Sequence, residues 1–70
     1  MTMNFEYDKE VDAAYIYLQY PMKDGQTKTS VELSDNMVLD FDTEGKLLGV
    51  EMLNASNVLQ KKTLMEAQPA

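Results

Sequence analysis

The chain has 70 residues, no cysteine, no histidine and a formal net charge of −6. A single small domain spanning residues 1–70 is therefore expected, while disulfides, thiolate zinc sites and histidine-based catalysis are excluded. All six basic residues are lysines against twelve acids, so the surface would repel nucleic acid and attract a basic protein. Because neither a signal peptide nor an apolar run of membrane-spanning length is visible, we expect a cytoplasmic protein with no membrane partner.

The first part of the chain predicts an antiparallel hairpin. Apolar and polar residues alternate over residues 3–7 and again over 13–19, with a polar break between them. The β-branched and aromatic side chains of the second segment suit a pleated surface. Pro21 and Gly25 are then expected to end this strand in a turn, because proline cannot donate to a ladder and glycine permits tight turns.

The same alternation predicts three more strands, at 27–33, 37–42 and 47–52. The last two would form a second hairpin. A two-residue loop at Glu44 and Gly45 would place Leu39 opposite Val50 and make one face wholly apolar. A three-residue loop with a glycine bulge is better turn chemistry, but it shifts the register by one residue and mixes the faces. We favour the two-residue loop.

The hydrophobic period changes after the fifth predicted strand. Asn54 is a favourable N-cap, and apolar residues at helical spacing predict a helix over about 55–66, followed by a tail at 67–70. The expected fold is α+β. It is a curled antiparallel sheet of about five strands, two hairpins plus a middle strand, with one C-terminal helix packed on its apolar face.

The segment from Asp40 to Glu51 also fits the spacing of a calcium-binding EF-hand loop. Asp40, Asp42, Glu44 and Glu51 would supply ligands at positions 1, 3, 5 and 12, and Gly45 occupies the glycine position. The segment before this loop, however, is a poor helix, since it contains β-branched residues and a turn cluster. We therefore favour the hairpin and expect no metal or cofactor, with these four acids kept as the alternative metal site.

Four tyrosines lie in the first twenty residues. If Ile16 and Leu18 face the core, Tyr15 and Tyr17 point outward together. An outward aromatic pair is typical of an interaction surface, and equally of cross-strand packing that stiffens a hairpin; both interpretations stay open. Because a small sheet with a thin core often gains stability by oligomerising, we expect a homo-oligomer, most simply a dimer.

Two segments resemble a known family. Residues 7–13, Tyr-Asp-Lys-Glu-Val-Asp-Ala, and 15–18, Tyr-Ile-Tyr-Leu, resemble its opening signature, and residues 39–56 resemble its second half. The family is the small bacterial and archaeal domain of unknown function 2283. The resemblance covers about residues 3–60, although Lys9 stands where the family often has proline. It implies a compact β-rich domain with a terminal helix, and it brings no established activity and no catalytic residues.

Three functions follow from these observations. The leading hypothesis is a non-enzymatic binding or structural module that self-associates through the outward tyrosines and an exposed sheet edge. The first alternative is an acidic, antitoxin-like inhibitor of a basic protein, because the charge would steer a positive partner toward it. The second alternative is divalent-metal binding by the acidic loop. An enzyme is not expected, since the usual catalytic groups are missing.

Overall fold

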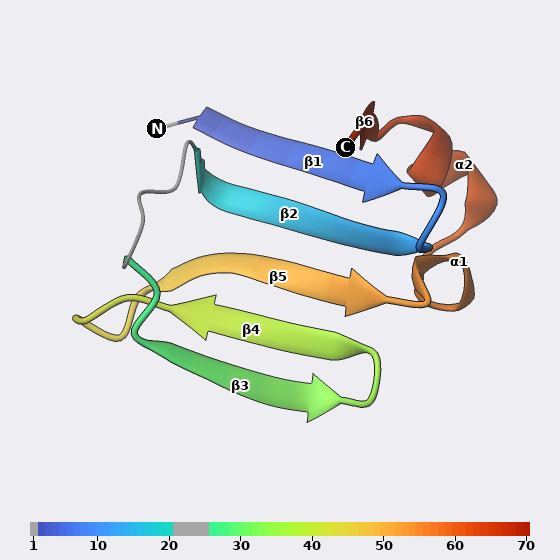
Figure 1. Cartoon of the computed structure of the whole chain (residues 1–70). Helices are drawn as coiled ribbons and strands as arrows, with labels where there is room; N and C mark the ends of the chain where they lie inside the picture. Colours follow the sequence, from blue (N-terminus) through green and yellow to red (C-terminus); the bar gives the residue numbers. More distant parts are fainter. Residues whose placement is uncertain (1, 21–25) are drawn as a thin grey trace.

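The computed structural model describes residues 2–20 and 26–70, which form an open, six-stranded sheet and two short helices (Figure 1). The strands are β1 (Thr2–Asp8), β2 (Ala13–Tyr20), β3 (Thr29–Ser34), β4 (Met37–Phe41), β5 (Leu47–Leu53) and β6 (Gln68–Pro69). The helices are α1 (Ala55–Val58) and α2 (Lys61–Met65). The strand order is β3-β4-β5-β2-β1-β6. The turn predicted at 21–25 lies outside the described residues.

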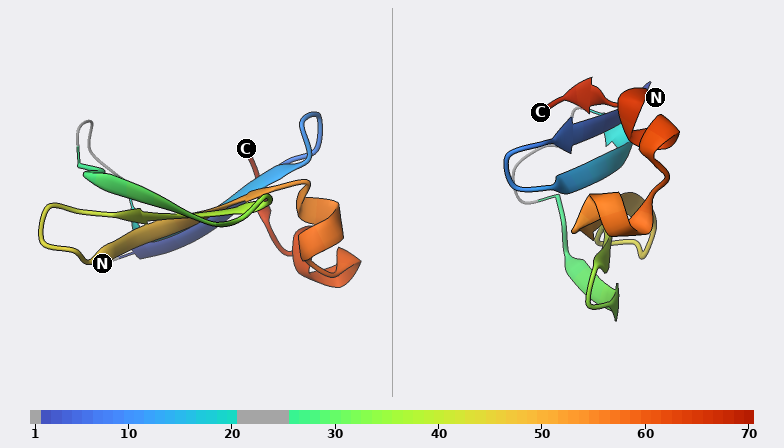
Figure 2. Two further views of the ribbon diagram at one scale, coloured as in Figure 1. Left: turned by 90° about the horizontal axis from the view of Figure 1, so that it is seen from below. Right: turned by 90° about the vertical axis from the view of Figure 1, so that its right-hand side faces the viewer.

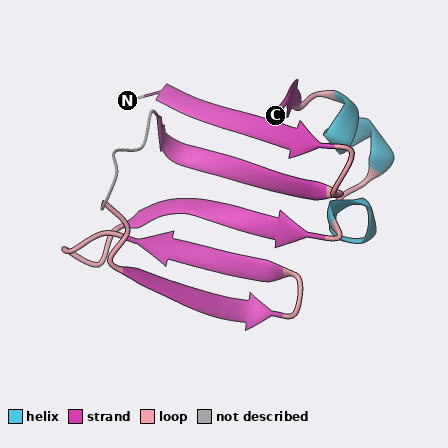
Figure 3. Cartoon of the chain, in the orientation of Figure 1, coloured by secondary structure: helices cyan, strands magenta, loops and turns pink. Residues whose placement is uncertain are grey.

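The α+β class and both predicted hairpins are confirmed, whereas the prediction of a five-stranded antiparallel sheet is wrong. A sixth strand, β6, runs parallel to β1 and pairs Gln68 with Glu6, so the sheet is mixed (Figure 3). The N–H of Ala70 also donates to the carbonyl of Tyr7 at 3.2 Å. This segment was expected to be a tail, because two residues are too few to show alternation. Pro69 is tolerated there because an edge strand can leave one donor unused.

The hairpin of β4 and β5 has the predicted register over most of its length. Leu39 lies opposite Val50, as the two-residue loop required. Near the turn the pairing shifts by one residue, so that Phe41 lies opposite Leu47. The extra residue is Leu48, which forms a β-bulge and is only 1% exposed.

The turn of this hairpin has three residues, so the expected two-residue loop is wrong. The N–H of Asp42 donates to the carbonyl of Lys46 at 2.9 Å, and Gly45 adopts a left-handed φ of 78°. The carboxylate of Asp42 accepts the N–H groups of Glu44 and Lys46 at 2.8 and 2.9 Å. The glycine turn and the favourable register coexist because the bulge at Leu48 absorbs the difference of one residue.

Side chains segregate to the two sides of the sheet. Two rows of paired residues lie on the side that we call the apolar face: Phe5, Ile16, Val50, Leu39 and Val31, and beside them Tyr7, Ala14, Met52 and Met37. Two rows lie on the other side, which we call the polar face: Glu6, Tyr15, Glu51, Val38 and Glu32, and Asn4, Tyr17, Gly49, Asp40 and Ser30. The strand period of two residues therefore separates them cleanly.

The predicted helix at 55–66 is broken into two. Leu59 and Gln60 have extended backbones, with ψ near 150°. Leu59 and Leu64 both pack against the core around Ala14 and Met52. A straight helix would point two residues five apart in directions differing by about 140°, so the break lets both leucines reach the core.

The two helices cover only one end of the apolar face. Figure 2 shows the sheet edge-on as one thin layer, with both helices on one side of it and at one end. Among the described residues, the apolar side chains that are buried outright are Ala14, Leu48, Met52 and Ala55. Val31 is 44% exposed and its row is otherwise half-buried. The core is therefore small: its main cluster, Ala14, Met52 and Ala55, lies where the helices meet the sheet, whereas Leu48 is buried separately near the start of β5.

We expect Gly45→Ala to lower the free energy of unfolding by about 1 kcal/mol, the cost of a left-handed conformation for an L-residue. A Cβ at this position meets nothing within 4 Å, so the penalty is conformational rather than steric. Gly45→Asn is the matched control and should lose less, because asparagine tolerates this region. Urea unfolding measures both, and equal losses would contradict this assignment.

Candidate interaction surface

Tyr15 lies across the polar face and connects non-adjacent strands. Its hydroxyl donates to a carboxylate oxygen of Asp40 at 2.6 Å, although β5 lies between the strands of the two residues. The other oxygen of Asp40 accepts the hydroxyl of Ser30 at 2.6 Å. Burial of Tyr15, followed by its bond to Asp40, raises the pKa of Tyr15 far above its usual value. One carboxylate thus ties the sheet together from β2 to the edge strand β3.

Gly49 makes this arrangement possible. A Cβ at position 49 would lie 2.5 Å from the ring of Tyr15 and 2.7 Å from the carbonyl oxygen of Ile16. No other residue type would leave room for the ring to pass over β5. The glycine is therefore required by the close approach of a side chain, and it is buried beneath that ring.

The predicted tyrosine pair lies together on the polar face. The ring centroids of Tyr15 and Tyr17 are 4.5 Å apart, with their planes inclined at 50°. Both side chains are half-buried. Four carboxylates share the two rows of this face, namely those of Glu6, Glu32, Asp40 and Glu51. The polar face is therefore aromatic and acidic, and the role of Tyr15 and Tyr17 in binding a partner stays a prediction.

The candidate metal ligands are dispersed along the second hairpin. Asp40 accepts two hydroxyls, and Asp42 accepts two N–H groups of the turn. Glu44 is exposed and lies 3.8 Å from the ammonium of Lys46, while Glu51 lies opposite Tyr15. Within residues 2–20 and 26–70, no three acidic side chains are placed to hold a metal ion. The segments that flank the turn are strands, as the hairpin interpretation required.

Asp12 accepts several hydrogen bonds that connect separate elements, and the sequence did not indicate this role. Its carboxylate accepts the hydroxyl of Tyr7 at 2.7 Å, the hydroxyl of Ser56 at 2.7 Å and the N–H of Ser56 at 3.0 Å. Its carbonyl accepts the N–H of Ala55 at 2.9 Å. These bonds attach α1 to the first hairpin. The bonds from Tyr7 and then Ser56 lower the pKa of Asp12, and the bond to Asp12 raises the pKa of Tyr7.

Asn54 stands at the N-cap position of α1, as predicted, but its side chain makes no capping bond, and Asp12 takes that role. Asn54 is left-handed, with φ of 52°, and caps nothing with its side chain. Its amide instead donates to the side chain of Asn36 at 3.0 Å. Asp12 is itself left-handed, with φ of 54°. Aspartate and asparagine tolerate that region, but Asp8 lies in the same polar break, so this signal alone does not identify Asp12.

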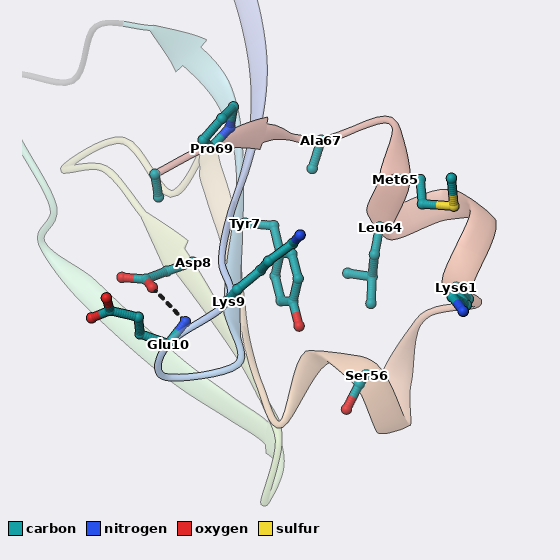
Figure 4. Close-up of a pocket in the computed structure, with 11 residues that line it drawn as sticks. Tyr7, Asp8, Lys9, Glu10, Ser56, Lys61, Leu64, Met65, Ala67 and Pro69 are labelled. Carbon is teal, nitrogen blue, oxygen red and sulfur yellow. Dashed lines mark hydrogen bonds between the residues drawn. The ribbon is translucent and has the colours of Figure 1, made fainter.

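A groove lies beside the Asp12 contacts, between the first hairpin and α2 (Figure 4). Tyr7 and Leu64 point toward one another in it. Lysines and acids both line it, including Lys61 and Glu10. The hydroxyl of Ser56, which also lines the groove, donates to Asp12. The groove thus combines side chains of both charges with a larger apolar surface.

Neither α1 nor α2, the helices of the described residues, has the length or the apolar character of a membrane span.

The fold and its two faces define a small single-sheet α+β protein with one apolar side and one acidic, aromatic side. The chain belongs to the family described as "Protein of unknown function (DUF2283)", whose model matches residues 4–56. This confirms the resemblance seen in the sequence. The match includes Asp12, Tyr15 and Asp40, and it stops before α2 and β6.

One curated relative is an uncharacterized protein of the archaeon Methanocaldococcus jannaschii. It is 36% identical over 59 residues, which are 83% of this chain and 46% of that protein. The chain thus spans about half the length of this relative. No solved structure matches the chain.

Tyr15→Phe is expected to destabilise the protein by about 1 kcal/mol, because a hydrogen bond to a carboxylate is lost. In an Asp40→Ala background, the same change should cost much less, since its partner is already absent. A double-mutant cycle by urea unfolding measures this coupling. Additive losses would show that the two side chains do not act together.

Asp12→Asn should alter the pH dependence of stability. The folded pKa of Asp12 lies below the ordinary value of 3.8, so its contribution is fully present above that pH and is lost as pH falls through the lowered pKa. The stability gap between wild type and Asp12→Asn should therefore shrink in acid, as thermal unfolding would record. Asp35→Asn, in the exposed β3–β4 turn, is the control for charge alone. A gap that stays constant down to pH 2 would contradict this role.

Proposed function

We propose that this protein is a non-enzymatic module that works by self-association. The observation that carries the proposal is the apolar face, which the helices cover at one end only. A sheet with one apolar side needs a second layer packed on it. Here the second layer consists of α1 and α2, four and five residues long, which is too little to cover five strands.

The size of the chain supports the same proposal. A domain of this length buries a modest share of its surface, and such domains often gain the missing burial by oligomerising. The fully buried apolar set includes two alanines, which contribute little area each. The half-buried row through Ile16, Val50 and Leu39 would add large side chains to the core if a second molecule covered it.

The environment of the acidic side chains supports a non-enzymatic role. The sequence has neither histidine nor cysteine. Asp12, Asp40 and Asp42 each accept at least two hydrogen bonds from the protein itself, and each bond holds parts of the backbone together. Carboxylates occupied in this way act as structural groups.

A second candidate function is binding of a basic protein, and the polar face favours it. Its two rows carry four carboxylates and two tyrosines and no lysine. Such a surface would attract lysine and arginine side chains, through charge and through the aromatic rings. The net charge of −6 would increase the rate of encounter. Self-association and this binding would use opposite sides of the sheet.

Analytical ultracentrifugation tests the first function. We expect the wild-type chain to sediment at twice its monomer mass. Added salt should leave this dimer intact or strengthen it, because burial of apolar surface drives it and salt screens the repulsion between acidic chains. A complex with a basic partner should weaken as salt is added. A strict monomer at every concentration would rule out self-association.

A further inference from the structure

A half-buried part of the apolar face is a continuous row across five strands. Its members, from one side to the other, are Phe5, Ile16, Val50, Leu39 and Val31. Val31 belongs to β3, the edge strand, all of whose residues are exposed. The row beside it supplies the fully buried core residues Ala14 and Met52, against which Phe5, Ile16 and Val50 also pack on one side. The row from Phe5 to Val31, which we call the apolar strip, therefore lies beside the two helices.

Charge restricts what can cover this strip. Neither row of the apolar face contains a charged residue, although the chain carries a net charge of −6. The polar face concentrates carboxylates instead, including Glu6, Glu51 and Glu32. Two copies that met by their polar faces would bring these carboxylates together. Two copies that met by their apolar faces would keep them apart, separated by the thickness of two sheets.

The helices set the relative orientation of such a pair. They stand on one end of the apolar face, and among the described residues no helix lies on the other end, which we call the open end (Figure 2). A second copy related by a two-fold axis can place its own open end against the open end of the first. Both pairs of helices then lie at the outside of the contact, and neither obstructs it. A two-fold interface is also the commonest arrangement of identical chains.

Building on the proposed self-association, we propose that two copies pack apolar face to apolar face about a two-fold axis through the row that includes Leu39 and Val50. The sheets would then lie about 10 Å apart, as stacked sheets do. The polar faces, with Tyr15 and Tyr17, would both point outward. This differs from the sequence-based expectation, in which the tyrosines and a sheet edge formed the contact.

Two neighbouring positions on β3 provide a matched pair of variants. Val31→Lys places a charge in the strip, whereas Glu32→Lys changes the adjacent residue, which lies on the polar face. Both residues are exposed on the edge strand, so both variants should fold, as circular dichroism and urea unfolding will show. In ultracentrifugation we expect Val31→Lys to raise the dimer dissociation constant at least tenfold. Glu32→Lys should leave it unchanged or lower it.

A measurement on the unmodified chain supplies the second test. In a mixture of isotope-labelled and unlabelled copies, isotope-filtered nuclear Overhauser contacts should join the methyl groups of Leu39 and Val50 to the partner copy. A dimer that survives Val31→Lys, or whose contacts involve Tyr15 and Tyr17, overturns the assignment of this face while self-association stands. A wild-type monomer at all concentrations overturns both.

Discussion

A sheet that is apolar on one side needs a second layer packed on that side, and here the two short helices cover only part of it. The strand alternation places large apolar side chains in two adjacent rows on one face. The two short helices contribute Ala55, Val58 and Leu64 to the core around Met52. The row through Ile16 and Val50 also packs against this core but stays half-buried. The need for a second layer connects the thin core, the single-layer shape and the proposed self-association.

The polar face is organised by specific bonds rather than by burial. Hydrogen bonds among Tyr15, Asp40 and Ser30 join β2, β4 and β3, and Gly49 on β5 provides the space for the tyrosine ring. At the end of the sheet, Asp12 joins the first hairpin to α1. These two carboxylates compensate for a small apolar core, because each fixes elements that are far apart in the sequence. The two sides of the sheet thus differ in character: one is apolar, and the other is acidic and held together by side-chain hydrogen bonds.

Much of the fold could be predicted because it depends on local patterns. Alternation located both hairpins, and matching the faces placed Leu39 opposite Val50. The two-residue strand β6 was missed because it is too short for a pattern to appear. The helix break was missed because it depends on the position of the core residues that Leu59 and Leu64 contact. The bonds of Asp12 to Ser56 and of Tyr15 to Asp40 depend on which strands are neighbours, and local periodicity does not contain that information.

In the proposed dimer, a second copy covers the half-buried apolar row in solution. Paramagnetic relaxation of methyl groups by a soluble probe measures this directly, with the exposed Val11 as the internal reference. In concentrated samples we expect the methyl groups of Leu39 and Val50 to be nearly as protected as that of Met52, and to become accessible on dilution. Accessibility that is high and the same at every concentration would contradict the claim.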